Sequence, residues 1–277
     1  MNQRDLAESF RAMHRPGDPV LLPNVWDAAG ARLIASLGFG AVATSSAAVA
    51  YLEGFADGED IGREGMLAGV ARVVRAVDLP VTADMEAGYG PTVGDAEATA
   101  RGVIASGAIG LNFEDFDPAA DALYDADEAA ARIAAIRRVA GKFNVPLVIN
   151  ARTDVYLAEI GEPAGRMAET LRRAALYRNA GADCIFVPGV YDGPTIGELC
   201  RSIDAPVNVL ANASMPDLPE LRRLGVARVS LGSAPYRRAL TALRDLAIEA
   251  RDGSFAGCGG IVTHAEVQVL MKGALDA

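Results

Sequence analysis

The 277-residue chain has few of the residues on which several classes of protein depend. Only 6% of it is aromatic and its formal net charge is −10, so neither a stacking surface nor a basic groove for nucleic acid is expected. No apolar run is long enough to cross a bilayer, and the charged first residues lack the pattern of a signal peptide. The three cysteines are scattered without metal-ligand spacing, which predicts neither a zinc site nor a disulfide framework. We therefore expect a cytoplasmic protein with no membrane or nucleic-acid partner.

Apolar residues, in contrast, make up 51% of the chain and follow a regular pattern. Eight short runs alternate with segments of helical periodicity, and each run is continuous, as is typical of parallel strands buried on both faces. The runs are 20–23, 40–44, 81–84, 109–115, 147–151, 184–188, 207–212 and 228–232. Eight such units in a chain of this length predict one domain, residues 1–277, folded as a (β/α)8 barrel.

The sequence beyond about Ala239 contains more helical pattern than a barrel needs for closure. Several glycines, among them Gly253 and Gly257, interrupt this pattern. We expect residues 240–277 to form a C-terminal helical extension that packs on a neighbouring subunit.

Charged side chains follow three consecutive predicted strands, at the ends that converge on the mouth of a barrel. The third strand ends in Asp84 and Glu86, the fourth in Glu114 and the fifth in Arg152. Carboxylates brought this close would repel one another unless a cation lay among them, and oxygen donors without His or Cys suit Mg²⁺ or Mn²⁺. The planar fork of an arginine fits a carboxylate or phosphate. Together they predict a metal-dependent site that holds an oxyanion and stabilises an enolate.

These side chains also have a structural interpretation. A single Asp at a strand end can cap a loop or form an ion pair, and Ser45 and Ser46 can cap the next helix. Their joint occurrence on consecutive strand ends favours a functional site. An aldolase of another barrel family would need a Schiff-base lysine or a metal-binding histidine at a strand end. The only two lysines, Lys142 and Lys272, lie elsewhere, and neither histidine follows a predicted strand.

Six stretches at the strand ends carry a resemblance to a known family. In chain order they read PNVWDAAGARL, TSSAAVAYLEGFADGE, VTADMEAGYG, GLNFED, INARTDVYL and VNVLAN. Over roughly residues 21–233 the chain thereby resembles the isocitrate lyase/phosphoenolpyruvate mutase superfamily. The resemblance implies a (β/α)8 barrel that exchanges its last helix with a neighbour in a homodimer or homotetramer. It also implies Mg²⁺, a small 2-oxo carboxylate substrate and an enolate-like intermediate.

The resemblance also implies which residues bind the substrate. Ser45 matches the serine that holds the substrate carboxylate, with the backbone N–H groups of Ser46 and Ala47 beside it. Arg152 matches the arginine that contacts the substrate and takes part in catalysis. Asn212 matches an asparagine on the seventh strand that also contacts it.

A second group of matches concerns the metal. Asp84 corresponds to the direct Mg²⁺ ligand, while Glu86 and Glu114 correspond to residues that act through metal-bound water. Asp57 matches an acidic residue near the metal, and we expect Asp57 and Glu114 to take part in catalysis.

The sequence departs from the lyases of this superfamily in the half of the site that selects the second substrate group. The K-K-C-G-H loop that carries their acid/base cysteine is replaced by DFDPAADALYDADE at 115–128. Their sixth-strand glutamate is replaced by the turn 187–190, and a further glutamate by 213–216. Isocitrate or methylisocitrate lyase activity is therefore not expected.

Three functions remain open from the sequence. The leading hypothesis is Mg²⁺-dependent cleavage of a C–C bond in a small 2-oxo or 2-hydroxy dicarboxylate, with oxaloacetate-like acids as first candidates, since decarboxylation requires no cysteine acid. The first alternative is formation or hydrolysis of a P–C bond, as in phosphoenolpyruvate mutase or phosphonopyruvate hydrolase. The second is a metal and carboxylate binder without turnover.

Overall fold

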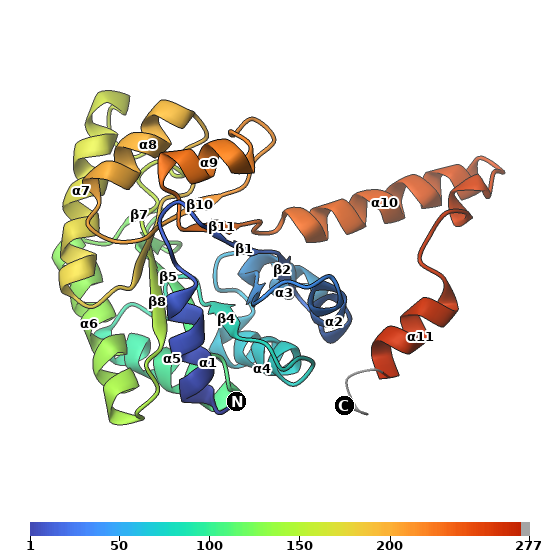
Figure 1. Cartoon of the computed structure of the whole chain (residues 1–277), viewed down its shortest axis with the longest axis horizontal. Coiled ribbons are helices and arrows are strands. Elements are labelled where there is room, and N and C mark those ends of the chain that lie inside the picture. Colours follow the sequence, from blue (N-terminus) through green and yellow to red (C-terminus); the bar gives the residue numbers. More distant parts are fainter. Residues whose placement is uncertain (273–277) are drawn as a thin grey trace.

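A ring of parallel strands surrounded by helices forms the centre of the molecule (Figure 1). The computed structural model describes residues 1–272. The strands are β1 (Val20–Leu22), β2 (Asn24–Val25), β3 (Val42–Thr44), β4 (Val81–Asp84), β5 (Gly110–Glu114), β6 (Phe116–Asp117), β7 (Ala122–Leu123), β8 (Val148–Arg152), β9 (Cys184–Phe186), β10 (Val207–Leu210) and β11 (Arg228–Ser230). The ring has the order β1-β11-β10-β9-β8-β5-β4-β3-β2, while β6 and β7 form a separate antiparallel hairpin.

The ring closes through its first strand, which is divided in two. β1 pairs with β11 and β2 pairs with β3, both in parallel. Pro23 stands between the two parts, and it has no N–H to donate to a neighbouring strand. The side chain of Asn24 bridges this position, because its Nδ2 donates to the carbonyl of Thr44 at 2.7 Å and its Oδ1 accepts the N–H of Gly232 at 2.8 Å. The predicted (β/α)8 barrel is confirmed.

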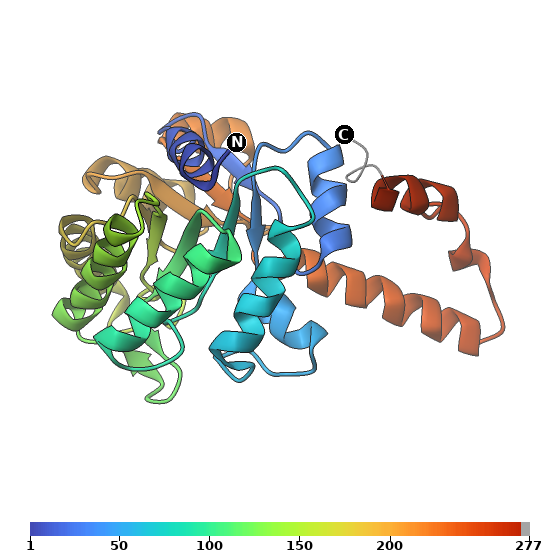
Figure 2. The ribbon, with the colours of Figure 1, turned by 90° about the horizontal axis from the view of Figure 1, so that it is seen from below.

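Helices follow the strands and cover the outside of the ring (Figure 2). The helices are α1 (Gln3–Ala12), α2 (Ala28–Ser36), α3 (Ser46–Leu52), α4 (Gly62–Val74), α5 (Val93–Ser106), α6 (Ala126–Lys142), α7 (Pro163–Asn179), α8 (Gly193–Ser202), α9 (Leu218–Leu224), α10 (Ala234–Arg251) and α11 (His264–Lys272), with a short 3₁₀ turn at Ala256–Cys258. Within residues 1–272, none of these helices has the length and apolar character that crossing a membrane requires.

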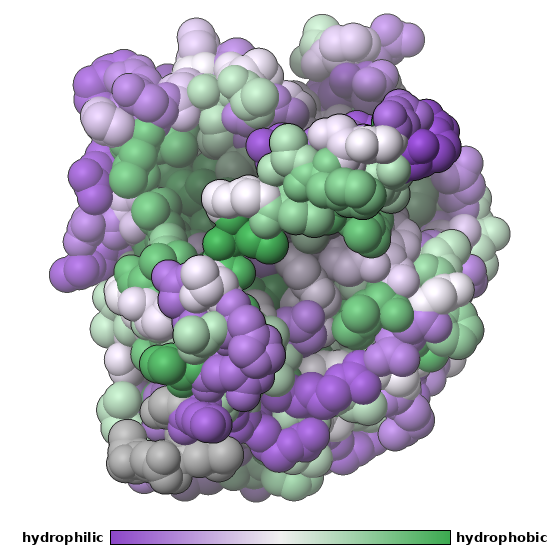
Figure 3. Space-filling view, turned by 90° about the vertical axis from the view of Figure 1, so that its right-hand side faces the viewer, coloured by the Kyte–Doolittle hydropathy of each residue, from purple (hydrophilic) through white to green (hydrophobic). Residues whose placement is uncertain are grey.

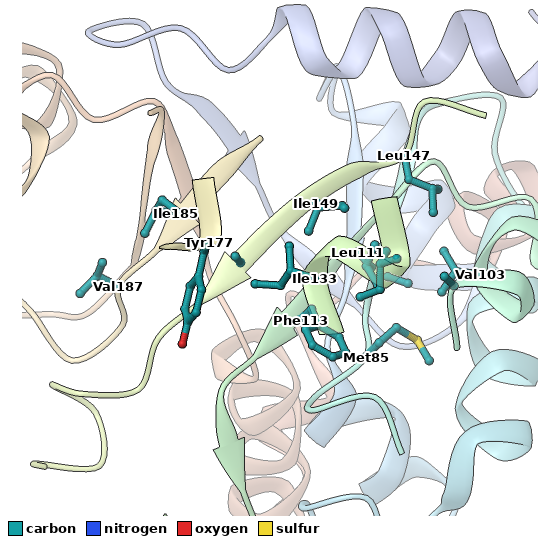
Figure 4. Close-up of a cluster of buried hydrophobic side chains, with 14 of the residues drawn as sticks. Met85, Val103, Leu111, Phe113, Ile133, Leu147, Ile149, Tyr177, Ile185 and Val187 are labelled. Carbon is teal, nitrogen blue, oxygen red and sulfur yellow. The ribbon is translucent and has the colours of Figure 1, made fainter. Parts of the chain in front are cut away.

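Alternation along the strands separates the outer core from the barrel interior. Leu111, Phe113 and Ile149 point outward and pack against the helices in one large buried cluster (Figure 4). The intervening residues Asn112 and Asn150 point inward and bond to each other, Nδ2 of Asn150 donating to Oδ1 of Asn112 at 2.7 Å. The interior above the floor of the barrel is therefore polar, which is what a site at the strand ends requires.

Helix α1 closes the opposite end of the barrel. Its Ala7 and Phe10 are fully buried against Leu22, Ile109 and Val148 near the beginnings of the strands. This apolar floor separates the polar interior from solvent at the amino-terminal end of the ring.

The C-terminal part of the chain leaves the barrel. Helix α10 extends away from the ring and contains no buried residue, and α11 turns back toward α2 (Figures 1 and 2). Apolar side chains are exposed along α10, including Leu240, Leu243 and Ile248, and this end of the molecule presents apolar patches among polar ones (Figure 3). We propose that the extension 240–277, of which 273–277 lie outside the described residues, packs on a second copy of the chain.

Substitutions on α10 test this proposal. Light scattering after size exclusion should give a dimer or tetramer for the wild-type protein. Leu243→Glu should shift the protein to a smaller species, because a charge without a partner would be buried in the contact. Phe143→Glu is the matched control, since Phe143 is 52% exposed and Leu243 63% exposed, but Phe143 follows α6. A monomeric wild-type protein would contradict the proposal.

Candidate active site at the barrel mouth

A cavity of about 160 Å³ lies at the carboxyl ends of the strands, where barrel enzymes carry their active sites. Its lining residues are Asn24, Ser45, Ser46, Ala47, Asp57, Asp84, Asn112, Arg152, Leu157, Phe186, Leu210, Ser230, Gly232 and Ser233. The structure thus brings together six of the predicted site residues: Ser45, Ser46, Ala47, Asp57, Asp84 and Arg152. A larger cavity of about 480 Å³ lies between α2 and α11, and no predicted site residue lines it.

Asp84 is the last residue of β4 and is held by three hydrogen bonds. Its Oδ2 accepts the backbone N–H of Ser46 at 3.0 Å and the hydroxyl of Ser46 at 2.9 Å. Its Oδ1 accepts Nδ2 of Asn112 at 3.2 Å. The carboxylate is buried apart from the face toward the cavity. Both oxygens are therefore fixed in position, and each retains capacity for a further partner.

The beginning of α3 forms the adjacent wall. Ser45 is the N-cap of this helix, and its hydroxyl accepts the N–H of Ala48 at 3.4 Å. Ser45, Ser46 and Ala47 are all buried and line the cavity. The structural interpretation of Ser45 as a helix cap and its proposed contact with substrate are compatible, because a hydroxyl oxygen that accepts one hydrogen bond can still donate its own proton.

Arg152, at the end of β8, forms ion pairs with two carboxylates. Its Nη1 lies 2.7 Å from Oε2 of Glu114, its register partner on β5. Its Nε and Nη2 donate to the two oxygens of Asp154 at 2.6 and 2.7 Å. Burial opposes the charge of Arg152, but Glu114 and Asp154 raise its pKa above the usual range. Arg152 is therefore a permanent cation in the cavity wall.

Glu86 lies behind the cavity in a tightly wound loop. Its backbone has φ of +48°, and the following Gly88 and Tyr89 also have positive φ. Its Oε2 accepts the N–H of Glu59 at 2.8 Å and its Oε1 accepts the hydroxyl of Tyr89 at 2.9 Å. Oε2 thus ties the loop after β4 to the loop after α3, while Oε1 holds the loop after β4 together.

Negative charge accumulates around Asp84. Burial and the charges of Asp57 and Asp84 raise the pKa of Glu86 to about 8. Burial also raises the pKa of Glu114, although Arg152 opposes this change. Much of Asp57 is exposed to solvent, yet partial enclosure and the neighbouring Asp84 raise its pKa as well. A cation among these carboxylates would relieve the repulsion between them.

The donor set fits a hard divalent cation held by few protein ligands. Among residues 1–272, no three His, Cys, Asp or Glu side chains come together as a metal-binding group. Of the three predicted metal residues only Asp84 lines the cavity, while Glu86 and Glu114 stand behind it. Mg²⁺ typically binds in this way, through one or two carboxylates with water and substrate as its other ligands. That Asp84 binds the metal directly, with Glu86 and Glu114 acting through metal-bound water, stays a prediction.

Asn212 lies outside the cavity lining. It is exposed in the loop after β10, where its Oδ1 accepts the N–H and the hydroxyl of Ser214 at 2.9 and 2.8 Å. The structure does not bring it together with Asp84 and Arg152, and its contact with substrate stays a prediction.

A buried arginine beneath the cavity was not predicted as part of the site. Arg228 of β11 is fully buried, and its Nη2 donates to Oδ1 of Asn112 at 3.0 Å. Asn112 in turn donates to Asp84, so one amide separates the arginine from that carboxylate. Burial lowers the pKa of Arg228 to about 10, which still leaves it charged at neutral pH. The signal in the sequence was a charged residue at the start of the predicted strand 228–232.

Comparison with known proteins gives these features a context. The chain matches the family model described as phosphoenolpyruvate phosphomutase over residues 10–251. The chain belongs to this family. The superfamily resemblance seen in the sequence is thereby confirmed. The family takes its name from an enzyme.

Individual relatives match most of this chain. Protein Rv1998c of Mycobacterium tuberculosis (strain ATCC 25618 / H37Rv) is 36% identical over 245 residues, covering 88% of this chain and 90% of that protein. An oxaloacetate decarboxylase of Chromohalobacter salexigens is 29% identical over 258 residues, covering 91% and 87%. A solved structure from Burkholderia cenocepacia J2315, described as a phosphonomutase, is 45% identical with a TM-score of 0.85, covering 88% and 99%.

Glu86 should make the stability of the metal-free protein depend on pH. Its pKa of about 8 in the folded protein lies above the value of 4.5 expected when unfolded, so the folded protein binds more protons between these values. The contribution of Glu86 is therefore present at low pH and is lost as pH rises through 8, by about 3–5 kcal/mol.

Urea unfolding in EDTA across this pH range measures the effect. Glu86→Gln should reduce the fall in unfolding free energy with pH, because the amide cannot ionise. Mg²⁺ added to the wild-type protein should also reduce it. If the unfolding free energy falls with pH as steeply in Glu86→Gln as in the wild-type protein, the pKa of Glu86 is not raised in the folded protein and the prediction is wrong.

Proposed function

We propose that this protein catalyses the Mg²⁺-dependent cleavage of a C–C bond in a small 2-oxo or 2-hydroxy dicarboxylate, with oxaloacetate-like acids as first candidates. The observation that supports the proposal best is the single cavity in which Asp84, Arg152 and the beginning of α3 meet. Its volume of about 160 Å³ suits a small acid. The relationship to oxaloacetate decarboxylases supports the same class of reaction.

The cavity lining contains donors suited to a 2-oxo carboxylate. Three of the five N–H groups of Arg152 are taken by Glu114 and Asp154, which leaves two for the substrate. We expect the hydroxyl of Ser45 and the N–H group of Ala47 to bind the same carboxylate from the opposite side, with the N–H of Ser46, which donates to Asp84 at 3.0 Å, shared between Asp84 and the substrate. Asp84 would hold Mg²⁺, with Mn²⁺ as a substitute, and the bound ion would supply Lewis-acid polarisation of the 2-oxo group.

The carboxylates around Asp84 would have two kinds of role, proton transfer and the positioning of other groups. Cleavage leaves an electron pair on the carbon next to the 2-oxo group, and a proton must reach that carbon. Asp57 lies at the solvent side of the cavity and has a raised pKa, so it can pass a proton from solvent. Glu114 keeps Arg152 in place through its ion pair, and Glu86 holds the loop after β4.

Phosphonate chemistry is the second candidate, favoured by the similarity to the structure described as a phosphonomutase. A phosphoryl group needs several cationic or N–H partners. Arg152 is the one cationic side chain among the residues that line the cavity. For this reason we place C–C cleavage first. A protein that binds metal and carboxylate without turnover is the remaining alternative.

Assays of the purified protein test the proposal. Pyruvate release is measured from a panel of 2-oxo and 2-hydroxy dicarboxylates and from phosphonopyruvate, with Mg²⁺ or with EDTA. We expect metal-dependent pyruvate from one dicarboxylate, and Asp84→Ala should lower kcat/KM about a hundredfold or more because the metal ligand is lost. Asp5→Ala, in α1 at the other end of the barrel, should retain activity.

The other outcomes are equally informative. Pyruvate from phosphonopyruvate alone would establish the second candidate. No product from any compound, with Mg²⁺ binding intact by calorimetry, would exclude both reactions for this panel and favour the binder.

A further inference from the structure

Three apolar side chains form the wall of the cavity opposite the predicted metal residue. They are Leu157 in the loop after β8, Phe186 at the end of β9 and Leu210 at the end of β10. We refer to them as the apolar wall. In the eight-stranded ring, β9 and β10 lie four positions from β3 and β4, which carry Ser45 and Asp84 toward the cavity. The cavity thus extends from Ser45 and Asp84 to the apolar wall, and an acid that fills it contacts both.

The turn after β9 fixes this wall in place. Gly189 has φ of +87°, and a Cβ at this position would lie 2.7 Å from the backbone nitrogen of Leu157. Only glycine allows the loop after β8 to approach so closely. Phe186 is 4% exposed and stands beside Arg152 in the β8–β9 register, with its ring centre 5.9 Å from the guanidinium carbon. The wall is thus a built part of the cavity.

The wall offers no positive charge to a second carboxylate. Arg152, beside Phe186, is the one cationic side chain among the lining residues. Glu114 and Asp154 take three of its N–H groups, and we assign the other two to the first carboxylate of the substrate. A carboxylate placed against Leu157, Phe186 and Leu210 would lose water without gaining a charged partner, which is unfavourable. The same position suits an uncharged group of similar size.

We propose that the apolar wall is the subsite for the group that leaves, and that it favours departure of a carboxylate as CO₂. This inference rests on the proposed function. The bond between the leaving carboxylate and its carbon breaks, and its electron pair passes through that carbon to the 2-oxo oxygen. Neutral CO₂ is released, and one proton from solvent then converts the enolate into the 2-oxo acid. The wall disfavours the charged ground state and accepts the uncharged product, so the chemical step is accelerated at the expense of substrate affinity.

A cation introduced into the wall tests the kinetic side of the proposal. Leu210→Lys is compared with Leu210→Met, which controls for the change in side-chain shape. The lysine should stabilise the bound carboxylate of the substrate before it leaves as CO₂. Both KM and kcat for this substrate should therefore fall relative to the methionine variant, kcat by about tenfold. Thermal unfolding of both variants verifies that they fold. A higher kcat in Leu210→Lys would overturn the proposal, because it would show that the leaving group requires a cation.

Binding of two acids that have no 2-oxo group, and so cannot lose CO₂, tests the wall without decarboxylation. Malate and 2-hydroxybutyrate share the 2-hydroxy carboxylate, but one ends in a carboxylate and the other in a methyl group. With Mg²⁺ present, calorimetry should show that 2-hydroxybutyrate binds the wild-type protein at least as tightly as malate, and that Leu210→Lys reverses the order. Tighter binding of malate to the wild-type protein, or binding of neither acid, would overturn the proposal. If the wild-type protein decarboxylates nothing, the proposed function fails, and this pair of acids still decides the nature of the wall.

Discussion

The ion pairs of Arg152 are the interaction on which the rest of the mouth depends. They join the ends of β5 and β8 through Glu114 and continue to Asp154 in the following loop. Removal of the arginine would leave two buried carboxylates without a cation, which is among the most destabilising changes a protein interior can suffer. The same pairs leave only part of the guanidinium free. The orientation of Arg152 is therefore set before the substrate binds. The affinity for the substrate depends on the N–H groups of Arg152 that Glu114 and Asp154 leave free.

Much of the barrel and half of the site were predictable because parallel strands bring their carboxyl ends to one edge. Asp84 and Arg152 end two such strands, so the strand pattern alone predicts that they lie together, and the cavity contains both. Ser45 also follows a predicted strand, and the resemblance to the superfamily gave it a role. The resemblance added Asp57, which lies in a loop whose path the periodicity does not reveal. Family membership is confirmed, whereas the role of each side chain stays a proposal.

The rest could not be predicted for physical reasons that differ from residue to residue. Phe186 and Leu210 look like core residues in the sequence, since an apolar side chain at a strand end carries no sign of whether it faces helices or a cavity. Arg228 begins the last strand of the ring, and its link to Asp84 passes through an amide from another strand. Asn212 illustrates the opposite case, because a polar residue after a strand can bond within its own turn instead of reaching the cavity.

The division of the first strand at Pro23 has a consequence for how the mouth can move. A closed barrel is rigid because every strand is hydrogen-bonded along both edges, but here the two halves of one strand each bond on one side only. The backbone continues through Pro23, and the side chain of Asn24 adds bonds to Thr44 on one side and to Gly232 on the other. The first strand is thus a seam beside the cavity, where each half has one ladder and the amide of Asn24 supplies the bonds on the other side. Local opening there would break one short ladder and the bonds of Asn24, whereas a strand elsewhere in the ring is held by ladders along both edges.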